Sequence, residues 1–277
     1  MELKQNPFSL YDFLGYFTPG AILLYIAGYF AKIIWPDAPT FHDITAQAGL
    51  EKAEAYVPFV LFAYAIGHLL SFVSSVTIER YSIWAMGYPS KYLLGVSQAG
   101  YFHSERHPAL RAVIRSVVFA LILPVSLMDL VLGKFLGMRD LYAKPLDDLL
   151  IKIIREKVYK LIQVVGGVEN PTQHGKAYGT DFFRFAYHYA VENAPHHLPK
   201  MQNYVALFGF LRNISLIVVL AFWPTAYAVA KGLVAWPALL ALAVVSYLCF
   251  MAFVKFYRRF CLEALMATAV SYNRPAT

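Results

Sequence analysis

"AYAIGHLLSFVSSVTIERY", residues 63 to 81, begins as an apolar membrane span and ends as a polar helix. At about 100° per residue, its polar side chains gather on one helical face within an arc of about 80°. The residues on that face are Tyr64, His68, Ser71, Ser75 and Glu79. Because polar groups in a bilayer are costly, this alignment predicts a face turned toward protein or water rather than lipid.

The composition of the whole chain is that of a membrane protein. Of its 277 residues, 59% are hydrophobic and 15% are charged, whereas soluble domains carry about 25% charged residues. The chain also contains 20 Tyr, 21 Phe and 4 Trp, which suits the aromatic belts at membrane interfaces. The net charge of +7 is therefore first a signal of topology.

Four stretches have the apolarity of a membrane span, and their lengths are close to the roughly 20 residues that a span needs. They cover about residues 14–35, 56–76, 214–230 and 233–254. The linker between the first two is acidic, whereas the chain beyond the second and the "KFYRRF" segment after the fourth are basic. Since basic loops stay inside, the sequence predicts two hairpins in a bacterial inner membrane, with both termini cytoplasmic.

Residues 112–138 form a further apolar segment that does not read as a simple crossing. Pro124 interrupts its middle, Asp129 lies in its apolar run, and both of its flanks are basic. One crossing cannot join two cytoplasmic flanks. We therefore expect a re-entrant or in-plane helical segment, or a segment buried against the other spans.

These observations predict an all-α membrane protein, built as a four-span bundle of two hairpins with a helical cytoplasmic insert. Its expected parts are an N-terminal hairpin (1–76), the insert with its membrane-associated segment (77–204), and a C-terminal hairpin with a tail helix (205–277). Within the insert, residues 145–165 repeat apolar positions at helical spacing and predict an amphipathic helix.

The polar face of the second span has two interpretations. In the functional one, His68, Ser71, Ser75 and Glu79 line a narrow aqueous path, and His68 titrates near neutral pH. In the structural one, small and hydroxyl residues allow close helix packing, and a neutral His68 makes one interhelical hydrogen bond. The sequence favours the structural interpretation without excluding the other.

Arg212 and Asn213 mark the predicted inner edge of the third span. The guanidinium of Arg212 is expected to pair with Glu79, or with Glu263 on the last helix, or to reach the lipid headgroups instead. Asp129 could line a pore, but a carboxylate in such a run more often faces a partner or the interface.

The sequence offers little support for catalysis or cofactor binding. It contains no P-loop, no HExxH pair and no dinucleotide fingerprint, so we expect no catalytic residues, no metal site and no cofactor. The basic positions of residues 152–160 alternate with apolar ones. This pattern favours a membrane-surface face over nucleic-acid binding.

The stretches "GHLLSFVSSVTIER", "GYPSKYLL" and "YVALFGFLRNISL", with the N-terminal "FSLYDFLGYFTPG", resemble a family of uncharacterised bacterial multi-pass membrane proteins. Where such proteins occur beside defence or nucleotide-signalling systems, the resemblance implies a membrane sensor or effector, including a role in antiviral defence. It implies no catalytic residues.

The expected function is an inner-membrane sensor or effector that self-associates and conducts ions or perturbs the membrane after a cytoplasmic signal. Its expected partners are the lipid bilayer, further copies of the chain and a cytoplasmic protein. One alternative is a non-conducting scaffold for that cytoplasmic partner. Another is a small transporter or membrane enzyme, which the missing inverted repeat and missing catalytic set disfavour.

Overall fold

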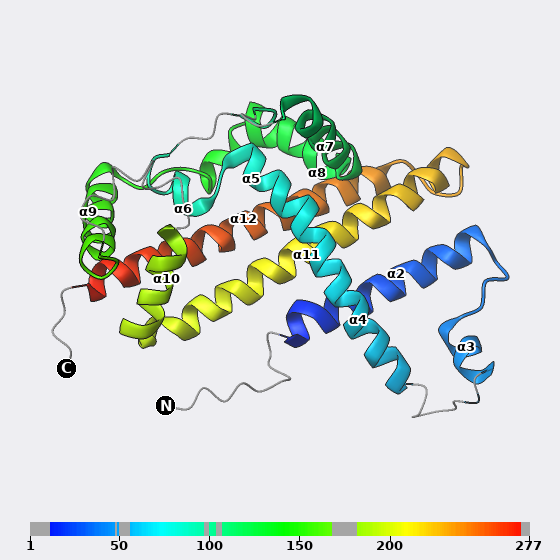
Figure 1. The fold of residues 1–277 in the computed structure, drawn as a ribbon. Coiled ribbons are helices and arrows are strands. Elements are labelled where there is room, and N and C mark those ends of the chain that lie inside the picture. Colours follow the sequence, from blue (N-terminus) through cyan, green and yellow to red (C-terminus); the bar gives the residue numbers. More distant parts are fainter. Residues whose placement is uncertain are drawn as a thin grey trace.

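The computed structural model describes residues 12–47, 49, 56–96, 100–103, 107–167 and 182–272. Within these residues the secondary structure is helical throughout, with no strand (Figure 1). The elements are η1 (Phe13–Phe17), α2 (Thr18–Ile34), α3 (Phe41–Gln47), α4 (Tyr56–Ser74), η3 (Ser75–Glu79), α5 (Arg80–Met86), α6 (Pro89–Tyr92), α7 (Pro108–Leu121), α8 (Leu123–Met128), η4 (Asp129–Phe135), η5 (Met138–Leu141), α9 (Asp148–Val164), α10 (Phe182–Asn193), η6 (Pro195–His197), α11 (Leu198–Ala230) and α12 (Pro237–Ser271).

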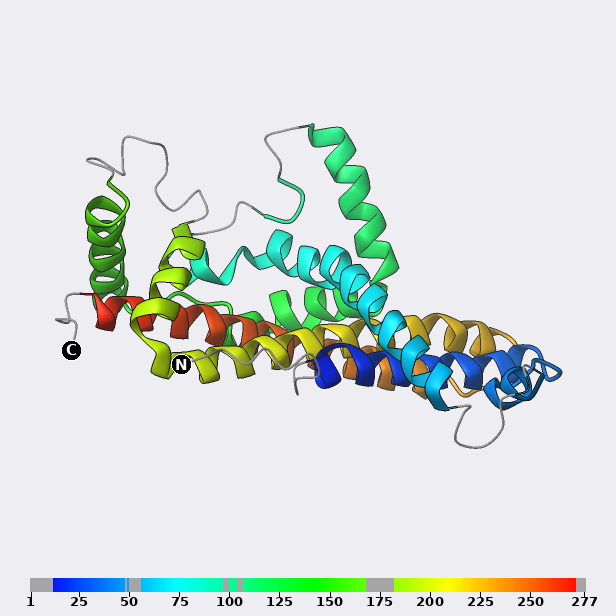
Figure 2. The same ribbon diagram turned by 60° about the horizontal axis from the view of Figure 1, so that its bottom comes forward.

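Four helical segments are long and apolar enough to cross a membrane, as the sequence predicted. They cover Phe13–Ile34, Tyr56–Tyr92, Pro195–Ala230 and Pro237–Ser271. Helices α11 and α12 lie side by side along their length and form the axis of the molecule (Figures 1 and 2). Helices α2 and α4 pack against each other and against α11.

The backbone of α4 approaches those of η1 and α2 very closely. A Cβ atom added at Gly20 would lie 1.8 Å from the carbonyl oxygen of Ala63, and one added at Gly67 would lie 2.0 Å from that of Tyr16. Only glycine fits at these two positions. Small residues are the usual means of packing helices in a membrane, where lipid tails remove the hydrophobic drive for association.

The turn between α11 and α12 is longer than the sequence indicated. The last span was expected to begin at Leu233, but α12 begins at Pro237. Gly232 takes a positive φ of 70°, and the N–H of Leu233 donates to the carbonyl of Ala228. This is the hydrogen-bond pattern of a glycine-terminated helix. Pro237 then suits the first turn of the next helix, where its missing N–H costs little.

The segment expected to be re-entrant or in-plane contains a sharp bend. Helix α7 and the Leu123–Phe135 helix meet at 94° with a break at Ile122. Figure 2 shows α7 projecting away from the α11–α12 axis, whereas α8 packs against α12. Pro124 falls at the start of the second helix, where a proline is tolerated. Pro124 therefore lies where the chain begins a second helix in a new direction.

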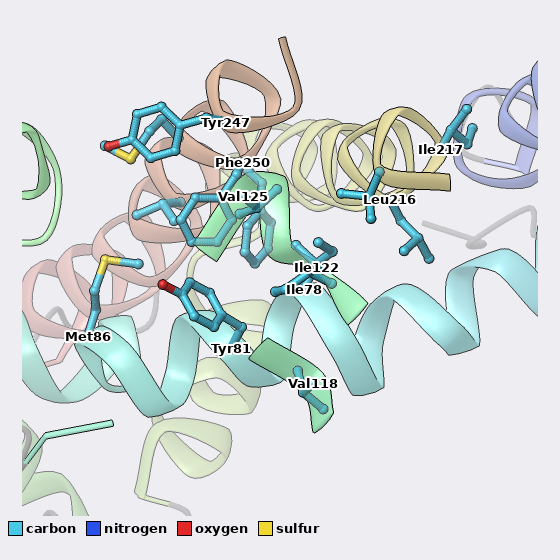
Figure 3. Close-up of a cluster of buried hydrophobic side chains, with 14 of the residues drawn as sticks. Ile78, Tyr81, Met86, Val118, Ile122, Val125, Leu216, Ile217, Tyr247 and Phe250 are labelled. Atoms are coloured by element: carbon cyan, nitrogen blue, oxygen red, sulfur yellow. The ribbon is translucent and has the colours of Figure 1, made fainter. Parts of the chain in front are cut away.

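One large core lies where α4, η3, α5, α7, α8, α11 and α12 meet. Figure 3 shows its aromatic and aliphatic side chains converging from these elements, with Tyr247, Phe250 and Ile78 completely or almost completely buried. Full burial of such side chains contributes about 1.5–3 kcal/mol each where the reference is water. Inside a bilayer, close packing is the larger part of their contribution.

A second core lies toward the other end of α12, where α9 and α10 pack on it (Figure 1). We call this region the head: α9, α10, η6 and the adjoining ends of α11 and α12. Ile154 and Val158 of α9 contact the cluster that contains Cys261 and Leu265 of α12. Helix α9 was expected over residues 145–165; it begins at Asp148, and the N-cap Asp147 accepts a 2.9 Å hydrogen bond from Leu150 N–H.

Candidate functional site

Arg212 is the centre of a buried polar cluster between α4, η3 and α11. It lies near the middle of α11, just before the long apolar stretch that starts at Ile214, and the residue is 9% exposed. The guanidinium forms an ion pair with Glu79 and donates to Ser74 Oγ over 3.0 Å. It also donates to the hydroxyl and carbonyl oxygens of Ser71 over 3.0 and 3.2 Å. All three guanidinium nitrogens therefore donate to protein oxygens.

Asn213 extends this cluster to the first helix. Its side-chain amide donates to the carbonyl of Gly15 over 2.9 Å, and its oxygen accepts from Ser74 Oγ over 2.5 Å. Asn213 is 1% exposed and Ser74 is fully buried. Because buried polar groups are costly without partners, this set of mutual hydrogen bonds holds η1, α4 and α11 in one register. We call it the Arg212 cluster: Arg212, Asn213, Ser71, Ser74 and Glu79.

A π-helical turn, η3, brings Glu79 to Arg212. A π turn places about one more residue in a turn than an α-helix does, so the following residues rotate by up to about 100°. On a regular α-helix, the buried face of α4 is that of Ala63, Gly67 and Leu70. The rotation in η3 is what turns Glu79 toward that face.

Of the predicted polar stripe, the structure brings Ser71 and Glu79 together and leaves two members outside the Arg212 cluster. Ser75 donates to the carbonyl of Phe72 on its own helix over 2.7 Å. His68 has an exposed side chain that stacks on Tyr16 with 3.9 Å between ring centroids, and its edge faces Tyr64. The stripe is therefore two environments, one buried and one at the outer surface of the bundle.

Asp129 forms a second buried polar group. It is completely buried and accepts a 3.0 Å hydrogen bond from Arg139 Nε and a 2.8 Å hydrogen bond from Tyr81 Oη. A Cβ at Gly133 would lie 2.2 Å from the Asp129 carboxylate, so a larger residue here would displace that carboxylate. Burial opposes the charge on Arg139, but the hydrogen bond and charge of Asp129 prevail and raise the Arg139 pKa. The carboxylate is thus paired within the protein.

Glu263 lies in the head, away from Arg212. Its carboxylate accepts from His197 Nδ1 and from Lys200 Nζ, each over 2.7 Å. These contacts join α12 to η6 and the first turn of α11. Of the two carboxylates that the sequence offered to Arg212, Glu79 is the one that pairs with it.

Three residues of these clusters were not among the site residues predicted from the sequence. Ser74 falls outside the aligned stripe on a helical wheel, yet it bonds both Arg212 and Asn213. Tyr81 and Arg139 meet Asp129 only after the chain has turned through the 94° bend. A sequence signal existed for Arg139 alone, since a buried carboxylate requires a cation nearby.

No group of three or more His, Cys, Asp or Glu side chains within the described residues could hold a metal ion. Comparison with known protein families, with curated proteins and with solved structures found no match. The fold is that of an α-helical protein with four helices able to span a membrane. Its described residues include two buried ion-paired clusters, one around Arg212 and one around Asp129.

Proposed function

We propose that this protein is a self-associating sensor or effector of the bacterial inner membrane, in which a cytoplasmic head is mechanically coupled to the membrane bundle. The observation that carries the proposal is the continuity of α11 and α12. Each is an unbroken helix, of 33 and 35 residues respectively. At 1.5 Å per residue they are about 50 Å long, whereas the apolar core of a bilayer is about 30 Å thick.

The excess length places about 20 Å of each helix outside the apolar core. On α12, Phe250 and Phe253 belong to the large core, and Cys261 and Leu265 belong to the head core. Ala267, two residues further on, packs against α10. One rigid helix thus contributes to both cores, so a displacement of the head by a ligand or partner reaches the spans without a flexible joint.

The proposed topology has α2 and α4 as one hairpin and α11 and α12 as the other, with both termini and the head in the cytoplasm. The basic stretch between the hairpins supports this orientation. Cysteine introduced at Lys231, in the α11–α12 turn, is expected to react with an impermeant maleimide in intact spheroplasts. Cysteine introduced at Asp148, in the head, is expected to react only after lysis. The reverse pattern would overturn the orientation.

Self-association is supported by His68. The side chain lies about 18 Å along α4 from Tyr56, well inside the apolar stretch, and it is exposed. Exposing an imidazole to lipid costs free energy, because the ring has no hydrogen-bond partner there. A second copy packed on this face can donate a hydrogen bond to the His68 ring or accept one from it. Native mass spectrometry from detergent is expected to show an oligomer that His68→Leu weakens. Phe72→Leu, one turn along the same exposed side, is the matched control.

The coupling is tested by destabilising the head core and measuring hydrogen exchange in the membrane bundle. Ile154 is completely buried in the head core, and Leu149 on the same helix is 69% exposed. In nanodiscs, Ile154→Ala is expected to increase hydrogen exchange in η3 and α5, whereas Leu149→Ala leaves it unchanged. An effect of Ile154→Ala confined to α9 and α10 would refute the coupling.

The second candidate is a non-conducting scaffold for a cytoplasmic partner, and the Arg212 cluster favours it. Its donors and acceptors hydrogen-bond one another in a mostly buried site, with the Glu79 side chain 21% exposed, which favours a packed polar contact over a water-filled path within one copy. Potassium flux from liposomes separates the candidates. A flux that His68→Ala abolishes supports the conducting effector, and a gradient retained at all membrane potentials supports the scaffold.

A further inference from the structure

We propose that a pocket between α5 and α7 binds the phosphate group of an anionic lipid at the membrane interface. The pocket has a volume of about 330 Å³ and is lined by Arg80, Trp84, Arg111, Ile114 and Arg115. This is the volume of roughly ten water molecules, enough for a phosphate group and part of the glycerol attached to it. Three of its five lining residues carry a guanidinium group, and none carries a carboxylate.

The structure holds one of these guanidinium groups in a fixed orientation. Arg115 is 6% exposed and donates from one terminal nitrogen to the carbonyl oxygens of Tyr101 and His103, the latter over 2.8 Å. Its Cζ atom lies 5.1 Å from the centre of the Trp84 ring. The planar guanidinium group of arginine matches phosphate oxygens in geometry as well as charge. A guanidinium group that is already oriented loses little conformational freedom when it binds.

The arrangement of charges favours an anion. Arg111 and Arg115 are four residues apart on α7, so they lie about one turn from each other and repel. Arg80 reaches the same pocket from α5. An anion bound among the three groups removes this repulsion and gains several charge-assisted hydrogen bonds.

The rest of α7 places this pocket at a lipid surface. Large apolar side chains on α7 are more than 45% exposed and fall within an arc of about 100° on one face; they are Leu110, Val113, Ile114, Val117 and Leu121. The helix projects sideways from the α11–α12 axis (Figure 2). A helix with this pattern lies in the membrane plane, its apolar face among the acyl chains and its arginines at the headgroups. The lipid is therefore favoured over a free phosphate as the source of the anion.

The site is tested by native mass spectrometry of the purified full chain with phosphatidylglycerol, phosphatidylcholine or inorganic phosphate. We expect phosphatidylglycerol to form an adduct with the wild type. The double variant Arg80→Gln/Arg111→Gln should bind this lipid about 30-fold more weakly, because it lacks two basic groups. The charge-matched control, Lys144→Gln with Lys152→Gln, should bind as the wild type does. Both control lysines are exposed and lie outside the pocket.

Each outcome decides the proposal. Selective loss of the phosphatidylglycerol adduct supports a lipid site, and displacement of that adduct by millimolar phosphate supports the same site with a soluble phosphate as its ligand. Equal binding by the double variant and the wild type overturns the site, as does the absence of any adduct with all three probes. If the double variant aggregates, the single variants Arg80→Gln and Arg111→Gln, each expected to weaken binding about fivefold, serve instead.

Discussion

Arg212→Met tests whether the Arg212 cluster stabilises the membrane bundle. The change keeps an unbranched side chain of moderate size but removes the cation, so the Glu79 carboxylate loses its ion pair, and Ser71 and Ser74 lose a donor. Breaking a buried pair in this way costs about 3–5 kcal/mol. Because the Glu79 side chain is 21% exposed and can be partly rehydrated, we expect the lower end, about 3 kcal/mol.

The assay is the free energy of unfolding in mixed micelles titrated with sodium dodecyl sulfate. Arg212→Met with Glu79→Met leaves no unpaired charge and should recover to within about 1 kcal/mol of the wild type. The exposed pair Lys160–Glu156 gives the control, since Glu156→Gln should leave the unfolding midpoint unchanged. A loss below about 1 kcal/mol for Arg212→Met, or a double variant as unstable as the single one, would refute the reasoning.

Three further changes have expected outcomes. Gly20→Ala should separate α2 from α4 and reduce the cross-linking yield between them, because its Cβ meets the backbone of Ala63, whereas Gly28→Ala in the same helix meets nothing within 4 Å and should be silent. Asp129→Asn should cost about 2 kcal/mol in the same unfolding assay, since it leaves Arg139 without its anion; no loss would mean that the pair contributes nothing. Asp147→Ala removes the N-cap of α9 and should raise hydrogen exchange there, at a cost of about 1 kcal/mol, with no change in α10.

The long helices were predictable because each depends on local composition. An apolar run of about 20 residues needs no partner to be recognised, and α9 has a helical repeat that survives in isolation. Glu79 could be named as a candidate partner of Arg212 because a guanidinium at a membrane boundary is expected to pair with a nearby anion or with the headgroups. What the sequence left open was the choice among Glu79, Glu263 and the lipid headgroups.

The rest of the candidate site depends on backbone geometry that no local pattern encodes. A helical wheel assumes a constant 100° per residue, and the π turn at Ser75–Glu79 breaks that assumption. The wheel therefore grouped His68 with Glu79, although one faces outward and the other faces Arg212. In the same way, Asp129 and Arg139 meet because of the chain's path through α8 and η4, which packing against α12 determines.

The shared role of α12 has a consequence for biosynthesis. Val158 of α9 is made about 100 residues before Cys261 and Leu265, the α12 residues of its own cluster. At about 5–20 residues per second, α9 waits roughly 5–20 s for its partner. Throughout that interval the part of its apolar stripe that packs on α12 is uncovered. The nascent head therefore passes through a stage in which the membrane surface is the nearest apolar phase for α9, and it completes its core only when the last helix has left the ribosome.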